Sequence, residues 1–131
     1  MNRLDAIIKN IESQDDISLI SLKVNENIFS SVVINSNDTN YSINDRVIIL
    51  FKETEVSIAK NFSGQISIRN KINSKIKDIK KGKILSKVML DIKNNFIESI
   101  ITTKSLNELD LKIDDEVIAL IKTNEITIMK A

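Results

Sequence analysis

The sequence predicts an all-β protein built from two copies of one small unit. Residues 43–60 return 70 positions later as residues 113–130, and nine of the 18 aligned positions are identical. Short stretches that alternate apolar and polar side chains recur along the chain, and they are rich in β-branched residues, as strands with one buried face are. Segments with a helical period are scarce, so strands must supply most of the core.

The repeat continues upstream with one adjustment. Residues 2–4 align with 70–72 at an offset of 68, as do residues 20–24 with 88–92. The second copy is therefore two residues longer. This insertion falls between residues 103 and 112, where a loop can absorb it. Two units of roughly 65 residues follow, each too small to bury much surface alone.

These units are predicted as domains spanning residues 1–62 and 63–131. The joint between them, residues 60–65, has no long run of Gly, Pro or Ser. Without a flexible linker of that composition, the two units are expected to pack against each other.

Each unit is expected to contain about five strands that end at polar turns. In the second unit the expected strands are residues 65–70, 74–81, 83–92, 96–103 and 116–129, the last broken near Asn124. Ser105 and Glu108 have the spacing of a capping box, which predicts a short helix over residues 105–109. This pattern predicts two tandem small Greek-key β-barrels of the OB type, each with a short helical turn. A β-sandwich is the alternative.

Composition restricts the function. The chain is 42% hydrophobic and 28% charged, which is typical of a soluble globular protein. No apolar run approaches the roughly 20 residues of a membrane span. Asp5 and Lys9 interrupt the segment that would have to be the apolar core of a signal peptide. A cytoplasmic protein without membrane partners is therefore expected.

Histidine and cysteine are both absent from the sequence. Their absence excludes disulfides, thiolate ligands, and nucleophilic catalysis of the Ser-His or Cys-His kind. The remaining carboxylates, such as Asp114, Asp115 and Glu116, lie beside turns, where solvated caps explain them. We therefore expect no enzyme activity, no catalytic residue, no bound metal cation and no cofactor.

Nucleic acid is not an expected partner. The net charge is only +1, and aromatic residues make up 4% of the chain, which leaves few stacking platforms for bases. The basic stretch at residues 75–83 alternates Lys with Ile, as a half-buried strand with one solvated face does.

Three places in the second unit carry hydrogen-bond donors that the strand pattern does not require. They are Ser67 with Arg69, Thr102 with Thr103, and Lys122 with Thr123. In an extended strand, Ser67 and Arg69 would point to one face. Arg, Lys and hydroxyl groups without a base form a set that suits a compact oxyanion. Because Arg and Lys on strands usually face solvent, the residues alone leave both interpretations open.

The order of these motifs resembles the Mop or molbindin domain of the TOBE family. The matching segments are Ser67-Ile68-Arg69-Asn70, Ile100-Ile101-Thr102, residues 105–111, and Ala119-Leu120-Ile121-Lys122-Thr123 with its continuation to Ile126. The resemblance covers the whole second unit with the motifs in the family order. It implies OB-like barrels, often in tandem as di-Mop proteins, that bind molybdate or tungstate at interfaces between barrels.

The resemblance also implies a set of ligand residues. Ser67 and Arg69 would hold the oxyanion, and Thr102, Lys122 and Thr123 would complete its shell, some of them from a neighbouring subunit. The expected set also includes two residues, Ser105 and Asn70, for which a structural role is an alternative explanation. Ser105 can serve as a helix cap, and Asn70 can fix the end of a strand.

The chain departs from the family pattern in several places. Family glycines appear here as Ser74, Asp110 and Asp114. Aspartate tolerates turn conformations, so the last two are modest changes. Ser74 could alter how closely two barrels approach.

The first unit departs further and is expected to be degenerate. Met1 aligns with Arg69, Ile34 with Thr102, and Glu53 with Thr123, while Ser67 has no counterpart. Lys52 retains the place of Lys122, so it marks a possible degenerate site. A carboxylate about 4 Å from an oxyanion would cost roughly 1 to 4 kcal/mol per unit charge, depending on the local dielectric.

Intracellular storage or homeostasis of molybdate or tungstate is the function that these observations favour. The alternative is the ligand-sensing or accessory module of a molybdate-responsive regulator or transporter ATPase. No Walker loop is present and no helix-turn-helix segment precedes residue 1, which favours a stand-alone protein. Apolar strands on small barrels favour a closed homo-oligomer, and the resemblance implies three di-domain chains with six barrels.

Overall fold

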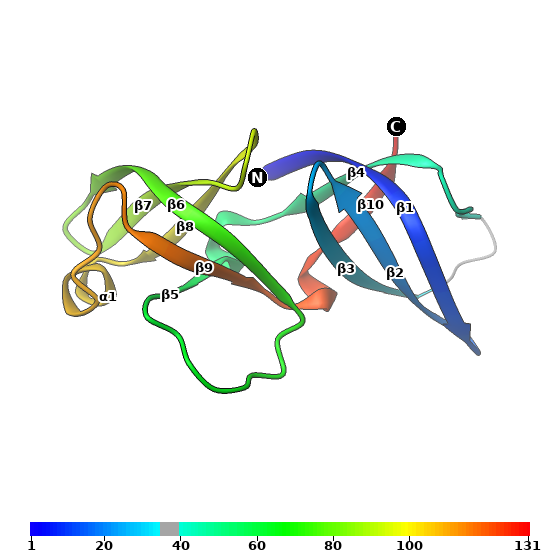
Figure 1. The fold of residues 1–131 in the computed structure, drawn as a ribbon, viewed down its shortest axis with the longest axis horizontal. Helices are drawn as coiled ribbons and strands as arrows, with labels where there is room; N and C mark the ends of the chain where they lie inside the picture. Colours follow the sequence, from blue (N-terminus) through cyan, green and yellow to red (C-terminus); the bar gives the residue numbers. More distant parts are fainter. Residues whose placement is uncertain (35–39) are drawn as a thin grey trace.

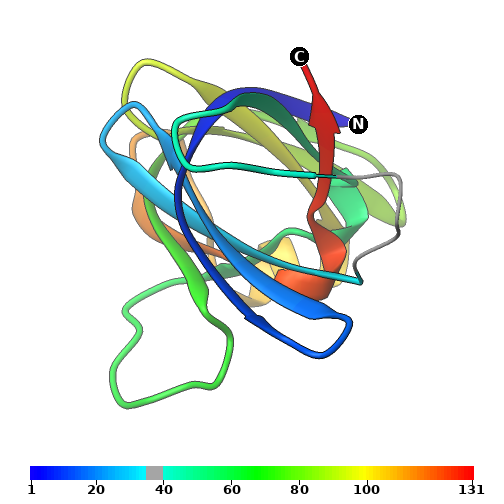
Figure 2. The same ribbon diagram turned by 90° about the vertical axis from the view of Figure 1, so that its right-hand side faces the viewer.

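A computed structural model of the chain describes residues 1–34 and 40–131. Within these residues, ten strands form two five-stranded antiparallel sheets, each curled into a small barrel (Figure 1). The barrels lie side by side along the long axis, and Figure 2 shows the strands of the first barrel curving around its interior. The all-β prediction is confirmed.

The elements repeat in the same order. The first repeat contains β1 (Asn2–Gln14), β2 (Ile17–Val24), β3 (Asn27–Ile34), β4 (Arg46–Phe51), the 3-10 turn η1 (Glu53–Glu55) and β5 (Ser57–Ala59). The second contains β6 (Asn70–Lys81), β7 (Leu85–Asp91), β8 (Phe96–Thr102), α1 (Thr103–Glu108), β9 (Glu116–Ile121), η2 (Thr123–Glu125) and β10 (Thr127–Lys130). Each repeat therefore has a short helical turn, and residues 35–39, where the counterpart of α1 would fall, lie outside the described residues.

A matching irregularity in the long first strands supports the alignment of the repeats. β1 changes register after Ile8, and β6 changes register after Ile76. At both places the backbone N–H donates to a turn carbonyl: Ile8 to Asp45 at 3.0 Å, and Ile76 to Asp115 at 2.9 Å. The bulge thus ties each long strand to the turn that precedes the fourth strand of its repeat.

The last strand of each repeat belongs to the sheet of the other repeat. The strand order is β10-β4-β1-β2-β3 in one sheet and β5-β9-β6-β7-β8 in the other (Figure 1). The 3-10 turns η1 and η2 redirect the chain from one barrel into the other. Each sheet therefore contains strands from both sequence repeats.

The core follows the alternation expected of strands. Ile8 and Leu22 in the first barrel and Ile76 and Leu90 in the second are fully buried at equivalent positions. These side chains belong to one cluster of buried apolar residues that extends through both barrels. Because the barrels share this core, they pack together as the short joint between the repeats predicts.

Of three expected elements, one agrees with the structure and two differ from it. The expected strand 116–129 is split by η2, so its predicted break near Asn124 is confirmed. The expected helix 105–109 begins earlier, at Thr103. Its N-cap residue is Thr102, not Ser105, and the Thr102 side chain accepts a hydrogen bond from the Ser105 N–H. The expected strand 65–70 is wrong, since only Asn70 is in a strand. No helix in the described residues has the length and apolar character needed to cross a membrane.

Candidate oxyanion-binding site

The paired ends of β6 and β9 bring several of the expected ligand residues to one place. Asn70 pairs with Ile121 in the register of these strands. Arg69 and Lys122 are the next residues on either side, and Thr123 begins η2 directly after Lys122. Residues far apart in the sequence thus meet where β6 begins and β9 ends.

The loop at residues 60–69 carries Ser67 and Arg69, and both side chains are exposed. This loop extends away from both barrels (Figures 1 and 2), and Gly64 in it has φ of +95°. The prediction that Ser67 and Arg69 share one face of a strand is therefore wrong. β9 turns into η2 after Ile121, so residues before Asn70 have no neighbouring strand with which to pair.

Asn70 joins the two barrels. Its side-chain Nδ2 donates to the Ser30 backbone carbonyl at 2.9 Å, and its side-chain Oδ1 accepts from the Ser30 N–H at 2.7 Å. The equivalent Asn2 makes the same pair of hydrogen bonds to the backbone of Glu98, at 2.9 and 2.8 Å. Asn70 is 1% exposed, so this cross-barrel contact already uses the polar groups through which it would bind a ligand.

Thr102 and Ser105 lie elsewhere in the same barrel. Thr102 pairs with Leu85 at the end of β8, next to α1. Figure 1 places α1 at the opposite end of β9 from η2. Thr102 and Ser105 line a cavity of about 390 Å³ together with Thr54 and Ser57, which the first repeat contributes. One chain therefore holds two separate groups of the expected ligand residues.

The first repeat has a different arrangement at the equivalent position. Lys52 precedes η1 with an extended backbone, as Lys122 precedes η2. Glu53 follows it, and its carboxylate lies 2.6 Å from the α-amino group of Met1. That hydrogen bond is the main cause of the lowered pKa of Glu53. A negative group therefore occupies the position that Thr123 has in the second repeat.

Four of the expected ligand residues in the second repeat have side-chain hydrogen-bond donors without an acceptor among the described residues. Within residues 1–34 and 40–131, the side chains of Ser67, Arg69, Lys122 and Thr123 make no hydrogen bond or ion pair. No group of acidic residues in the same part of the chain could hold a metal cation. Two cations and two hydroxyls that are free to donate can bind a compact anion.

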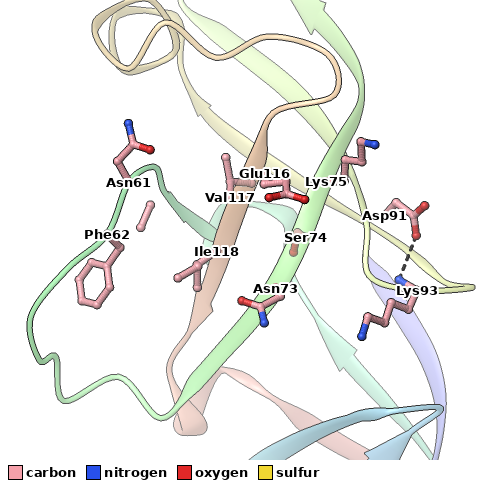
Figure 3. Close-up of a pocket in the computed structure, with 11 residues that line it drawn as sticks. Asn61, Phe62, Asn73, Ser74, Lys75, Asp91, Lys93, Glu116, Val117 and Ile118 are labelled. Carbon is pink, nitrogen blue, oxygen red and sulfur yellow. Dashed lines mark hydrogen bonds between the residues drawn. The ribbon is translucent and has the colours of Figure 1, made fainter.

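A broader cavity of about 590 Å³ lies on the outer face of β6 and β9 (Figure 3). Asn61 and Phe62 at the start of the loop form one wall, and Asp91 and Lys93 lie on the opposite side. Lysines and carboxylates alternate around it, so the cavity has no preference for anions. None of the expected ligand residues lines this cavity.

The comparisons with known proteins include a family match to the second repeat. The family model described as the TOBE domain matches residues 66–128. Molybdenum-pterin-binding protein 1 of Clostridium pasteurianum is 40% identical over 65 residues, which are 49% of this chain and 96% of the relative. The chain belongs to the TOBE family, and this relative is a Mop-like member of it.

Two further proteins are similar to this TOBE-family chain. Molybdenum-pterin-binding protein 2 of Clostridium pasteurianum is 37% identical over 65 residues, again 49% of this chain and 96% of the relative. A crystal structure of the cytoplasmic molybdate-binding protein ModG with molybdate bound has a TM-score of 0.94. The match covers 99% of this chain and 96% of that chain at 19% identity, and it confirms the two-barrel fold.

Proposed function

We propose that this chain binds molybdate or tungstate for intracellular storage or homeostasis, without catalysis. The observation that carries the proposal is the register of β6 and β9, which brings Arg69 beside Lys122 and Thr123 in the repeat that matches the TOBE family, with Ser67 two residues before Arg69. Their donors have no partner among the described residues, and a tetrahedral dianion would provide acceptors for all of them. Relatives named for molybdenum binding support the choice of ligand.

Isothermal titration calorimetry with molybdate, tungstate and sulfate tests the function. We expect saturable heat with molybdate and tungstate and a much weaker response to sulfate, because the site is expected to fit the larger oxyanions. Denatured chain in the same buffer is the control for non-specific heat. Absence of heat with both molybdate and tungstate would contradict the proposal.

We further propose that a complete site forms between copies of the chain in a homo-oligomer of three chains. The ligand donors are largely exposed in the single chain, and Thr102 and Ser105 lie apart from Arg69. A neighbouring copy can therefore complete the shell with its own Thr102. Light scattering should give three times the mass of one chain, and a monomer that still binds the oxyanion would contradict this assembly.

The equivalent lysines of the two repeats provide a direct test of which repeat binds. We expect Lys122→Met to raise the dissociation constant for molybdate at least about tenfold, the effect of losing one charge-assisted hydrogen bond. Lys52→Met should change it less than about twofold, because Glu53 follows Lys52 and no counterpart of Arg69 accompanies it. Calorimetry on both variants measures the difference, and equal losses would show that the first repeat also binds.

The alternative function is a ligand-sensing or accessory module of a regulator or transporter ATPase. Binding of the oxyanion would be shared by both functions, so partner capture distinguishes them. Recovery of a DNA-binding or ATPase subunit from cell extract with the tagged chain would favour the alternative over storage in the cytoplasm.

A further inference from the structure

The loop that carries Ser67 and Arg69 has few ties to the rest of the molecule. Within the described part of the chain, residues 61–69 make no hydrogen bond and no ion pair. Phe62, Ile66 and Ile68 are half-buried and supply the loop's apolar contacts. The position of the loop therefore depends on how its two ends are fixed.

Lys60 fixes the first end. Its Nζ donates to the Asp110 carbonyl at 2.8 Å and lies 3.1 Å from Oδ2 of Asp115. Oδ2 of Asp115 also accepts from the Lys112 N–H at 2.9 Å, so the carboxylate is itself held in the turn. That turn leads directly into β9, which ends at Ile121, immediately before Lys122. One side chain thus connects the start of the loop to the strand that leads to Lys122 and Thr123.

Asn70 fixes the second end through Ser30 of the first barrel. This contact has a counterpart in the other repeat, where Asn2 binds the backbone of Glu98. It therefore belongs to the general joining of the barrels. The Lys60 contact differs in this respect, as the equivalent residue of the second repeat shows.

Lys130 is the residue equivalent to Lys60, and Asp45 is equivalent to Asp115. Asp45 retains the turn hydrogen bond, from the Ser42 N–H at 2.8 Å. Lys130 does not reach it, because its Nζ lies over the ring of Tyr41, 5.8 Å from the centroid. Among the described residues, the contact of this lysine with the turn is therefore present at Lys60 and absent at Lys130.

We propose that Lys60 is a positioning residue for the oxyanion site, which fixes the loop of Ser67 and Arg69 by clamping its start to the turn at Asp110 and Asp115. The proposal rests on the proposed binding of molybdate. Lys60 itself does not contact the ligand. Its removal allows the loop to move, and binding must then order the loop again.

The test compares Lys60→Met with Lys60→Arg and with the matched control Lys130→Met. Lys60→Met should raise the dissociation constant for molybdate about tenfold, the cost of ordering one or two additional backbone residues. Lys60→Arg should retain most of the affinity, because arginine can still donate to the carbonyl and the carboxylate. Lys130→Met should bind as the unchanged chain does.

A spin label measures loop mobility separately from binding. The sequence has no cysteine, so Gln65→Cys gives a single labelling position on the exposed loop. The nitroxide should become more mobile in Lys60→Met and remain unchanged in Lys60→Arg and Lys130→Met. Asp115→Asn is a second route to the same effect, because an amide oxygen can still accept from Lys112 while the charge is lost. Circular dichroism confirms that each variant is folded.

Unchanged affinity in Lys60→Met, or an equal loss in Lys130→Met, would overturn the role of Lys60. Greater mobility with unchanged affinity would overturn it as well, because the clamp would then hold a loop whose order does not matter for binding. If the unchanged chain binds neither molybdate nor tungstate, the proposed function fails and this role fails with it. Binding by the unchanged chain therefore separates the two proposals.

Discussion

Replacement of Arg69 by alanine is expected to abolish most of the affinity for molybdate. A guanidinium can donate two parallel hydrogen bonds to an oxyanion, and loss of such a contact costs about 2 to 3 kcal/mol, a roughly 30- to 150-fold rise in the dissociation constant. Arg69 is exposed and makes no ion pair in residues 1–34 and 40–131, so its removal should leave the fold intact. Calorimetry with molybdate measures the loss.

Two further variants define what the guanidinium contributes. Arg69→Lys keeps the charge without the planar pair of donors, so an intermediate affinity is expected. Arg3→Ala removes an exposed arginine from β1 of the first repeat and should leave the affinity unchanged. Molybdate binding by Arg69→Ala with the affinity of the unchanged chain would remove Arg69 from the site.

Replacement of Ile128 by alanine should destabilise the first barrel although the residue belongs to the second repeat. Ile128 is 8% exposed and lies on β10, opposite Ile49 of β4. Truncation of a buried isoleucine to alanine typically costs about 2 to 4 kcal/mol. Chemical denaturation should show this loss, and hydrogen exchange should rise most in β4, which pairs with β10, and next in β1, which pairs with β4.

Met129 provides the matched control on the same strand. Its side chain is 39% exposed, so Met129→Ala should change the free energy of unfolding by no more than about 0.5 kcal/mol. If the increase in exchange in Ile128→Ala is instead confined to β6 and β9, the strand exchange is not the arrangement in solution.

Most of the fold could be predicted because strand periodicity is a local property. Alternation along residues 17–24 and 85–91 identifies one buried face whichever strand lies beside it. The partner of a strand is a non-local property, so the same pattern could not reveal that β5 pairs with β9 and β10 with β4. The prediction of a strand at residues 65–70 is wrong for a related reason. Residues 65–69 have the composition of a strand, but no neighbouring strand in the described part of the chain lies beside them to pair with.

The candidate site was predictable only as separate motifs. The resemblance to the Mop domain implied Ser67, Arg69 and Lys122 as ligand residues, and the pairing of Asn70 with Ile121 explains why Arg69 and Lys122 are neighbours. The motifs alone could not separate Thr102 from this group, because the distance between two residues along the chain does not determine their distance across a barrel. The role of Lys60 could not be predicted from the sequence, because a lysine is present at this position in both repeats and only the contacts of Lys60 and Lys130 in the folded chain differ.

The strand exchange also explains which part of the repeat has diverged least. Residues 43–60 and 113–130, the stretch with nine identities in 18 positions, run from β4 to β5 and from β9 to β10. Each copy of this stretch contributes a strand to both barrels, so the residues of one copy must be compatible with the packing of both barrels. The aligned positions Met1 and Arg69, of which Arg69 is an expected ligand residue, lie outside this stretch and carry no such double constraint. After duplication, one half could therefore lose its binding chemistry while remaining an indispensable part of the other half's architecture.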